Sequence, residues 1–199
     1  AGAGVADKRW TESRKKEIYN SRINSTNLLY HQLKEQSNRV RSFISASGVD
    51  YYPDTGDELV TEDHPPAGGF LGQTCVDWEQ TAQQIEQLDK RVVLLRTGLV
   101  LSANGGALKE IERPVKFGMA AYLGSGRQYY PWLHLNDLCR MYIHAIENES
   151  MSGPYNAVGP YAVRNKELTL TIAEVLNRPK IAVPTPKIAL HLMLGEMAA

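Results

Sequence analysis

Hydroxyl side chains gather in one ten-residue stretch, residues 43–52, which reads FISASGVDYY. Ser45 and Ser47 lie close together there and are followed by Tyr51 and Tyr52. A serine hydroxyl can donate a hydrogen bond to a reacting oxygen, and a tyrosine can exchange a proton near neutral pH once its pKa is lowered from about 10. The stretch is therefore either a proton-transfer site or a strand that ends in a turn above packed aromatic rings.

Two extended segments could position these hydroxyls. Residues 40–46 (VRSFISA) have the composition of a strand. Residues 91–101 (RVVLLRTGLVL) form a β-branched, apolar run typical of a strand buried on both faces of a parallel sheet. Between them lie a polar loop rich in Gly, Pro and Asp at 47–69 and a helical pattern at 72–88, where apolar residues recur every three or four positions.

Helical and extended patterns alternate along the rest of the chain. Helices are predicted over residues 11–36, with Thr11 as N-cap, and from residues 136 and 165 onward; short strands are predicted at 131–135 and 155–158; a Pro-rich link at 183–186 precedes a last apolar helix. This alternation indicates an α/β fold with a mainly parallel sheet. Because ligands bind beyond the carboxyl ends of such strands, we expect the site at Ser45–Gly48, at Thr97–Gly98 and at the turn Ala1–Gly4.

The composition narrows the classes of partner. Among 199 residues, 22 basic side chains balance 22 acidic ones, so no net charge favours nucleic acid or an anionic membrane surface. No apolar run reaches the roughly 18 residues that span a bilayer. Cys75 and Cys139 show neither metal-ligand spacing nor a disulfide framework, and we expect a reducing, cytoplasmic compartment and no metal site. The expected partner is a small-molecule substrate, and both a monomer and a homodimer remain open.

Several longer segments occur in an informative order. They are ADKRW (6–10), FISASGVDYY (43–52), YYPDTGDE (51–58), LRTGLVLSANGGAL (95–108), LGSGRQYYPWLHLNDL (123–138) and GPYNAVGP (153–160). Together they resemble the extended short-chain dehydrogenase/reductase superfamily, and within it the NADP-binding "epimerase family" subgroup. The resemblance covers nearly the whole chain. It implies a Rossmann-type doubly wound parallel sheet with a small C-terminal α/β substrate lobe, and it alone favours NADP(H) over NAD as the cofactor.

The resemblance also implies a missing part. Proteins of this kind begin with a strand and a G-x-x-G-x-x-G turn whose helix N-terminus receives the cofactor pyrophosphate. The chain starts instead on AGAG, which resembles the turn after the fourth strand. We therefore expect the sequence to be truncated at both ends. The expected division is 1–103 for the rest of the dinucleotide-binding domain, 104–130 for an excursion into the substrate lobe, 131–150 for the return, and 151–199 for the C-terminal substrate lobe.

Roles for the hydroxyl residues follow from the same resemblance. Ser47 aligns with the catalytic serine of the superfamily, which binds the reacting oxygen. The Tyr-x-x-x-Lys pair of the superfamily would fall at Gly72 and Val76, neither of which can transfer a proton. Tyr51 and Tyr52 are the candidate substitutes, and a water molecule is a third possibility. The predicted catalytic residues are thus Ser47, Tyr51 and Tyr52.

Binding residues are predicted from their place beside the strand ends and loops. Cofactor contacts are expected from Ala1, Gly2, Ala3, Ser45, Ala46, Ser47, Arg96, Thr97 and Gly98, and substrate contacts from Arg9, Trp10, Arg127 and Gln128. An arginine in the loop at 124–128 can clamp a carboxylate or phosphate in bidentate fashion. Tyr130 and Pro131 stand where nucleotide-sugar enzymes of the superfamily carry an Arg-Asp pair, which disfavours a nucleotide sugar.

Two functions remain open from the sequence. The first is an NADP(H)-dependent oxidoreductase or epimerase that acts on a small polar or sugar-like substrate with a non-standard active site. The second is a non-catalytic NADP(H)-binding sensor or scaffold protein.

Overall fold

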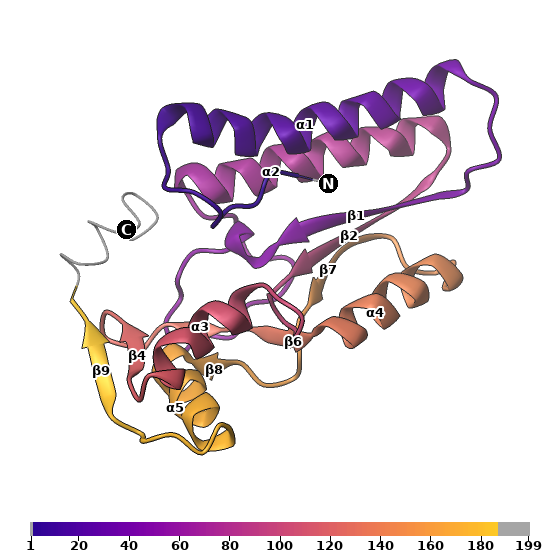
Figure 1. Cartoon of the computed structure of the whole chain (residues 1–199). Coiled ribbons are helices and arrows are strands. Elements are labelled where there is room, and N and C mark those ends of the chain that lie inside the picture. The colour runs from indigo at the N-terminus through magenta and orange to yellow at the C-terminus, as the bar shows by residue number, and fades with distance from the viewer. Residues whose placement is uncertain (1, 187–199) are drawn as a thin grey trace. The chain divides into compact units, whose positions relative to one another are not determined.

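The computed structural model describes residues 2–186 (Figure 1). The predicted cofactor contact of Ala1 and the predicted last helix lie outside these residues. The described residues divide into two compact units, a first unit of residues 2–97 with Cys139–Ala157 and a second unit of Gly98–Leu138 with residues 158–186.

The first unit is built on a parallel sheet. Its strands are β1 (Ser42–Gly48), β2 (Arg91–Thr97) and β7 (Gly153–Ala157), and they pair in the order β1-β2-β7 with all three parallel. The sheet confirms the predicted α/β class. The central strand β2 is buried from Val92 to Arg96, as its continuous apolar sequence predicts.

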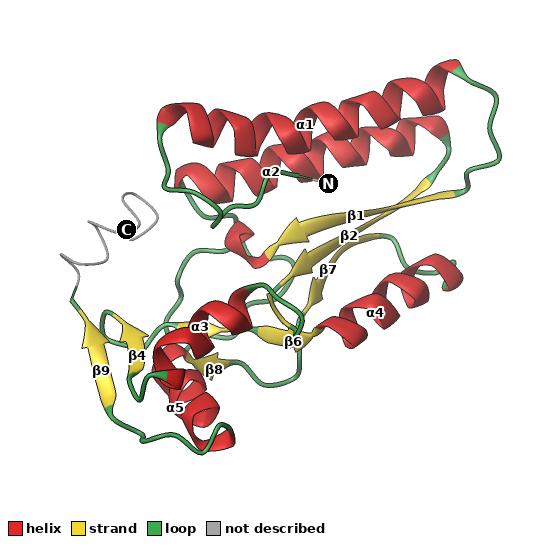
Figure 2. Ribbon diagram, viewed as in Figure 1, coloured by secondary structure: helices red, strands yellow, loops and turns green. Residues whose placement is uncertain are grey.

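Helices cover both sides of this sheet. Figure 2 shows α1 (Glu12–Glu35) and α2 (Gly69–Gln83) side by side on one side of the sheet, and residues 139–147 of α4 (Leu135–Glu147) on the other. Thr11 caps α1 as predicted, because its Oγ1 accepts a hydrogen bond from the Arg14 N–H at 3.2 Å. The buried core beneath the helices consists of Ala82, Ile85, Val92 and Leu94, with Tyr30, Leu33 and Phe43 packed against it.

The described part of the first unit also contains two short 3-10 helices. The 3-10 helix η1 (Val49–Tyr51) follows β1 directly, and η2 (Gln84–Leu88) continues α2. The first of them matters for the site, because it turns the chain at the carboxyl end of β1 and leads into the long loop at 52–68.

The predicted strand at 91–101 is broken at Gly98. A side chain at Gly98 would collide with the carbonyl oxygen of Pro131, which accepts a hydrogen bond from the Leu99 N–H at 2.7 Å. The chain therefore leaves the central sheet after β2, and Leu99–Leu101 forms a separate strand, β3. This break opens the second unit.

Up to residue 186, the second unit contains three strand pairs and the helices α3 (Ala107–Lys116) and α5 (Asn165–Val175). The pairs are β3 with β6 (Trp132–His134), β4 (Ala120–Leu123) with β9 (Ala182–Thr185), and β5 (Tyr129–Tyr130) with β8 (Val163–Arg164). Its buried core contains Leu101, Val115, Ala120, Leu168, Ile172 and Ala173. The prediction of a Pro-rich link at 183–186 is wrong for most of its length, because β9 pairs there with β4. Among residues 2–186, no helix has the length and apolarity to cross a membrane.

Candidate active site at the carboxyl ends of the parallel strands

One row of polar residues crosses the sheet of the first unit near its carboxyl end. Ser47 on β1 is the register partner of Arg96 on β2, and Arg96 is the partner of Asn156 on β7. Register partners in a parallel sheet project from the same face. Ser47 and Arg96 reach Glu79 of α2, and Asn156 reaches the Tyr52 hydroxyl. The row lies where ligands bind in open parallel α/β sheets.

A buried ion pair anchors this row. Glu79 of α2 and Arg96 are only 5 % and 3 % exposed. The Arg96 Nε donates to Glu79 Oε1 at 2.9 Å, and its Nη2 donates to Oε2 at 2.8 Å. Burial alone lowers the pKa of Arg96, but the hydrogen bonds with Glu79 and Tyr52 outweigh it and raise that pKa above its ordinary value. The guanidinium therefore stays charged and fixed in a bidentate pair.

The Ser47 hydroxyl is part of the same cluster. It donates to Glu79 Oε1 at 2.6 Å, and Ser47 is 5 % exposed. Its proton is thus directed into the ion pair. The neighbouring Ser45 is also buried, and its hydroxyl donates to the backbone oxygen of Ala46 at 3.0 Å.

The two tyrosines differ in how their hydroxyls are used. The Tyr52 hydroxyl accepts from Arg96 Nη1 and donates to Asn156 Oδ1, both at 2.7 Å. Burial raises the pKa of Tyr52, against the opposing effect of Arg96. Tyr51 instead places its ring face on the guanidinium, with 3.5 Å between the Arg96 Cζ and the ring centroid. The two rings meet edge to face at 5.2 Å between centroids.

The loop at 52–68 is fastened onto the strand ends. The backbone carbonyl of Glu62 accepts a hydrogen bond from Arg96 Nη1 at 2.9 Å. The Oε1 of the Glu62 side chain accepts one from the Asn156 backbone N–H at 2.8 Å. The Ala67 N–H donates to the Tyr51 carbonyl at 2.6 Å. Glu62 and Glu79 were not predicted as site residues. Glu79 could have been found from its place within the apolar helix pattern at 72–88, because a carboxylate that is buried there needs a cationic partner.

Gly72 explains why no tyrosine stands on α2 at the expected position. Gly72 is buried, and a Cβ there would collide with the carbonyl oxygen of Ala67. The loop at 52–68 therefore occupies the space that a side chain would need. Val76, at the position expected for the lysine, is half-buried.

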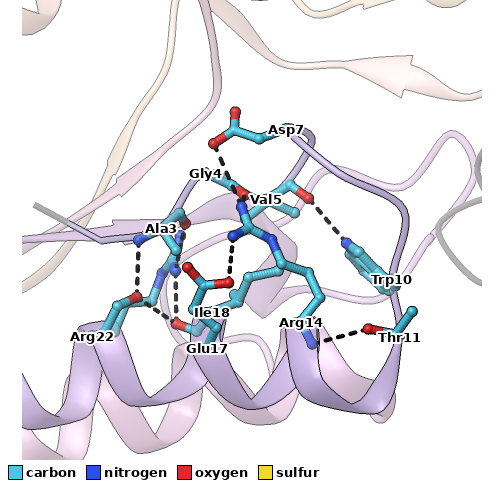
Figure 3. A network of polar contacts seen from close by, with 11 residues as sticks. Ala3, Gly4, Val5, Asp7, Trp10, Thr11, Arg14, Glu17, Ile18 and Arg22 are labelled. Atoms are coloured by element: carbon cyan, nitrogen blue, oxygen red, sulfur yellow. Dashed lines mark hydrogen bonds and ion pairs between the residues drawn. The ribbon is translucent and has the colours of Figure 1, made fainter.

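The predicted binding residues near the N-terminus are held against α1 (Figure 3). The Ala3 N–H donates to Ser21 Oγ at 2.9 Å, and its carbonyl accepts from Arg22 Nη1 at 3.1 Å. The Gly4 carbonyl accepts from Arg14 Nη2 at 2.6 Å.

Trp10 is anchored in the same segment. Its Nε1 donates to the Val5 carbonyl at 3.0 Å, and its ring meets Phe70 of α2 edge to face at 5.1 Å between centroids. Gly2 and Arg9 are exposed.

The other predicted substrate residues lie in the second unit. Arg127 is exposed and lines a cavity of about 440 Å³, together with Ser125, Gly126, Arg164, Lys166, Glu167, Leu170, Thr171 and Glu174. Gln128 turns inward, where its Nε2 donates to the Leu123 carbonyl at 3.2 Å. The first unit thus brings together Ser45, Ser47, Tyr51, Tyr52, Arg96 and Thr97, whereas Gly98, Arg127 and Gln128 belong to the second unit.

The strand ends offer a surface suited to a flat ring. Ala46, Gly48 and Thr97 are half-buried, in contrast to the buried residues before them on β2. The Thr97 hydroxyl donates to the Leu95 carbonyl at 3.1 Å. Small side chains let a ligand approach the backbone closely, so these residues fit a nicotinamide ring. The chain contains no G-x-x-G-x-x-G turn that would receive the pyrophosphate.

Comparison with known proteins places this arrangement in a family. Residues 1–159 match the model of the NAD dependent epimerase/dehydratase family. An epimerase family protein of Mycobacterium bovis is 39% identical over 197 residues, which cover 99% of this chain and 64% of that protein. One from Staphylococcus aureus is 38% identical over 199 residues, which cover all of this chain and 66% of that protein. The chain spans about two thirds of the length of these relatives.

Solved structures agree with this assignment. The human epimerase family protein SDR39U1 (isoform 2), crystallised with NADPH, matches the whole chain and 68% of its own at a TM-score of 0.91 and 29% identity. A nucleoside-diphosphate sugar epimerase of Corynebacterium glutamicum matches 93% of this chain and 40% of its own at a TM-score of 0.74 and 32% identity.

These matches show both the fold class of the chain and the family to which it belongs. The fold is Rossmann-like and of the extended short-chain dehydrogenase/reductase type, as predicted, and it is the fold of NAD(P)-binding oxidoreductases. The chain belongs to the NAD-dependent epimerase/dehydratase family.

Proposed function

We propose that the chain is part of an NADP(H)-dependent oxidoreductase or epimerase that acts on a small polar or sugar-like molecule. The observation that carries this proposal is its likeness, over the whole chain, to the human epimerase family protein crystallised with NADPH. The half-buried strand ends beside the Ser47–Arg96–Asn156 row support it, because nicotinamide rings bind at this edge of Rossmann-like sheets.

The bound cofactor would supply or accept a hydride, and the protein would supply position and proton transfer. Ala46, Ser47 and Thr97 would hold the nicotinamide, and Gly2 and Ala3 would line the cofactor on the α1 side. The hydroxyl that binds the reacting oxygen would come from Ser47, Tyr51 or Tyr52. Arg96 would act beneath them, since its guanidinium is buried against Glu79.

The proposed substrate carries an anionic or strongly polar group. Arg127 supports this, because it is exposed at a cavity and its fork of N–H donors matches a carboxylate or phosphate. Arg9 and Trp10 remain proposed substrate contacts in the first unit. A cytoplasmic location is proposed on the two free cysteines, Cys75 and Cys139.

Cofactor titrations of the protein in its full natural length test the cofactor proposal. We expect NADPH to bind and its nicotinamide fluorescence to change on binding, with NADH binding about tenfold or more weakly. Failure to bind either dinucleotide would overturn the proposed function.

A specific observation favours a second function, a non-catalytic NADP(H) sensor or scaffold. The Ser47 and Tyr52 protons are directed to Glu79 and Asn156, and Gly72 stands where the superfamily has its tyrosine. A panel of aldehydes, ketones and keto-sugars with NADPH separates the two functions. Cofactor oxidation by any member supports the enzyme, and tight NADPH binding without oxidation supports the sensor.

A further inference from the structure

We propose that Tyr51, not Ser47 or Tyr52, carries the hydroxyl that transfers the proton, and that Arg96 is its positioning residue. The inference rests on the proposed function and assigns the proton-transfer role within that site. It follows from how the three candidate hydroxyls are hydrogen-bonded and from how the Arg96 guanidinium is held.

Two of the three hydroxyl protons are already committed inside the protein. Ser47 donates to Glu79 Oε1 at 2.6 Å, and Tyr52 donates to Asn156 Oδ1 at 2.7 Å while accepting from Arg96. Releasing either proton to a substrate would break a hydrogen bond next to a buried charge, which costs free energy. Among residues 2–186, the Tyr51 hydroxyl has no hydrogen-bond partner, and Tyr51 is half-buried rather than enclosed. Its hydroxyl is the one that a substrate can use.

The ring of Tyr51 is nevertheless held in place. It lies on the Arg96 guanidinium, with 3.5 Å between the Cζ and the ring centroid, and Tyr52 packs against its edge. The guanidinium is itself fixed by Glu79 on one side and by Tyr52 and the Glu62 carbonyl on the other. The Tyr51 carbonyl accepts from the Ala67 N–H. A reacting group on such a rigid support loses little entropy when the substrate binds.

Tyr51 can supply the proton that the reduction of a carbonyl needs. In the reducing direction a bound reduced nicotinamide would supply the hydride to the carbonyl carbon of the substrate. The carbonyl oxygen takes the proton of the Tyr51 O–H, which yields an alcohol and a phenolate. The phenolate ring stays on the guanidinium face of Arg96, and a proton from solvent then restores the Tyr51 hydroxyl.

Acetylation of tyrosines by N-acetylimidazole, mapped by mass spectrometry, tests the assignment without a known substrate. We expect Tyr51 to react about tenfold or more faster than Tyr52, whose hydroxyl must first break its hydrogen bonds. NADPH should slow acetylation of Tyr51. Tyr161, which is 79 % exposed, is the internal control and should react equally with and without NADPH. Faster reaction of Tyr52, or no protection of Tyr51 under conditions where NADPH is bound, overturns the proposal while leaving the proposed function intact.

Kinetics on any carbonyl that the panel identifies test the chemistry. Tyr51→Phe should lower kcat by about 100-fold, the usual effect of losing a general acid, while KM and NADPH affinity change less than about twofold. Tyr161→Phe is the matched control and should keep its activity. A Tyr51→Phe enzyme whose kcat equals that of the natural protein contradicts the proposal.

A double-mutant cycle tests the positioning role of Arg96. Lysine keeps the positive charge near Glu79 but lacks the planar face on which Tyr51 stacks. Arg96→Lys should lower kcat in the natural background and have little further effect in the Tyr51→Phe background, because both changes disable the same group. Equal effects in the two backgrounds would mean that Arg96 acts only on folding.

Discussion

At the scale of residues, the site is organised around one buried charge pair. Glu79 and Arg96 join α2 to the central strand, and the pair fixes Ser47, Tyr51 and Tyr52 around it. The stretch FISASGVDYY therefore combines the two alternatives that its sequence left open. It is a strand that ends in a turn, and its hydroxyls meet at the end of the sheet.

Removing the Glu79 carboxylate should destabilise the first unit strongly. Glu79→Ala leaves the Arg96 charge buried without its partner, which costs about 3–5 kcal/mol in comparable sites. Urea unfolding followed by circular dichroism measures this loss. A change below about 1 kcal/mol would show that the pair is not buried as described.

The two tyrosines should respond differently to loss of the hydroxyl. Tyr52→Phe removes two hydrogen bonds and leaves Asn156 Oδ1 without its donor, so we expect a loss of about 1–3 kcal/mol in the free energy of unfolding. Tyr51→Phe keeps the ring on Arg96 and should change stability by less than about 0.5 kcal/mol. Equal losses in the two variants would contradict the hydrogen-bond assignment.

Cys75 predicts a pH dependence of stability. Burial raises the pKa of its thiol from the ordinary 9.0 to about 12. Because the pKa is raised in the folded state, the neutral thiol contributes to stability below about pH 9. That contribution is lost as the pH rises from 9 towards 12. From about pH 8 to about pH 10.5, the free energy of unfolding should therefore fall more in the natural protein than in Cys75→Ala. Parallel slopes in the two proteins would be the opposite result.

At the scale of elements, the helices and strands of the first unit follow from local signals. Thr11 caps α1, the apolar run at 91–97 forms β2, and the period of three to four residues forms α2. What local signals cannot give is contact between distant segments. Gly98 breaks the predicted strand because Pro131 approaches it, and the Pro-rich link becomes a strand because β4 lies beside it.

The fit of the loop at 52–68 against α2 predicts a glycine requirement. Gly72→Ala would place a methyl group against the Ala67 backbone, and we expect a loss of about 1–3 kcal/mol from overpacking. Gly68 is the matched control, because a Cβ there meets open space at an ordinary φ of −72°. Gly68→Ala should be neutral within about 0.5 kcal/mol, and a similar loss in both variants would mean that the loop does not pack on Gly72.

At the scale of the whole molecule, the sequence motifs were sufficient to predict the family and the Rossmann-like fold, both of which the comparisons confirm. The site was predictable in part. Ser47 and Arg96 follow from the rule that strand ends carry function. Glu79 and Glu62 reach the row only through tertiary folding, since 32 residues separate Ser47 from Glu79 and 94 separate Glu62 from Asn156.

Hydride transfer between the proposed cofactor and a carbonyl substrate can be followed by isotope labelling. The protein in its full natural length is incubated with NADPH deuterated at the transferred position of the nicotinamide and with the carbonyl panel. We expect deuterium at the former carbonyl carbon of an alcohol product, formed far more slowly by Tyr51→Phe. NADPH binding without deuterium transfer to any member of the panel would contradict it and would favour the non-catalytic function.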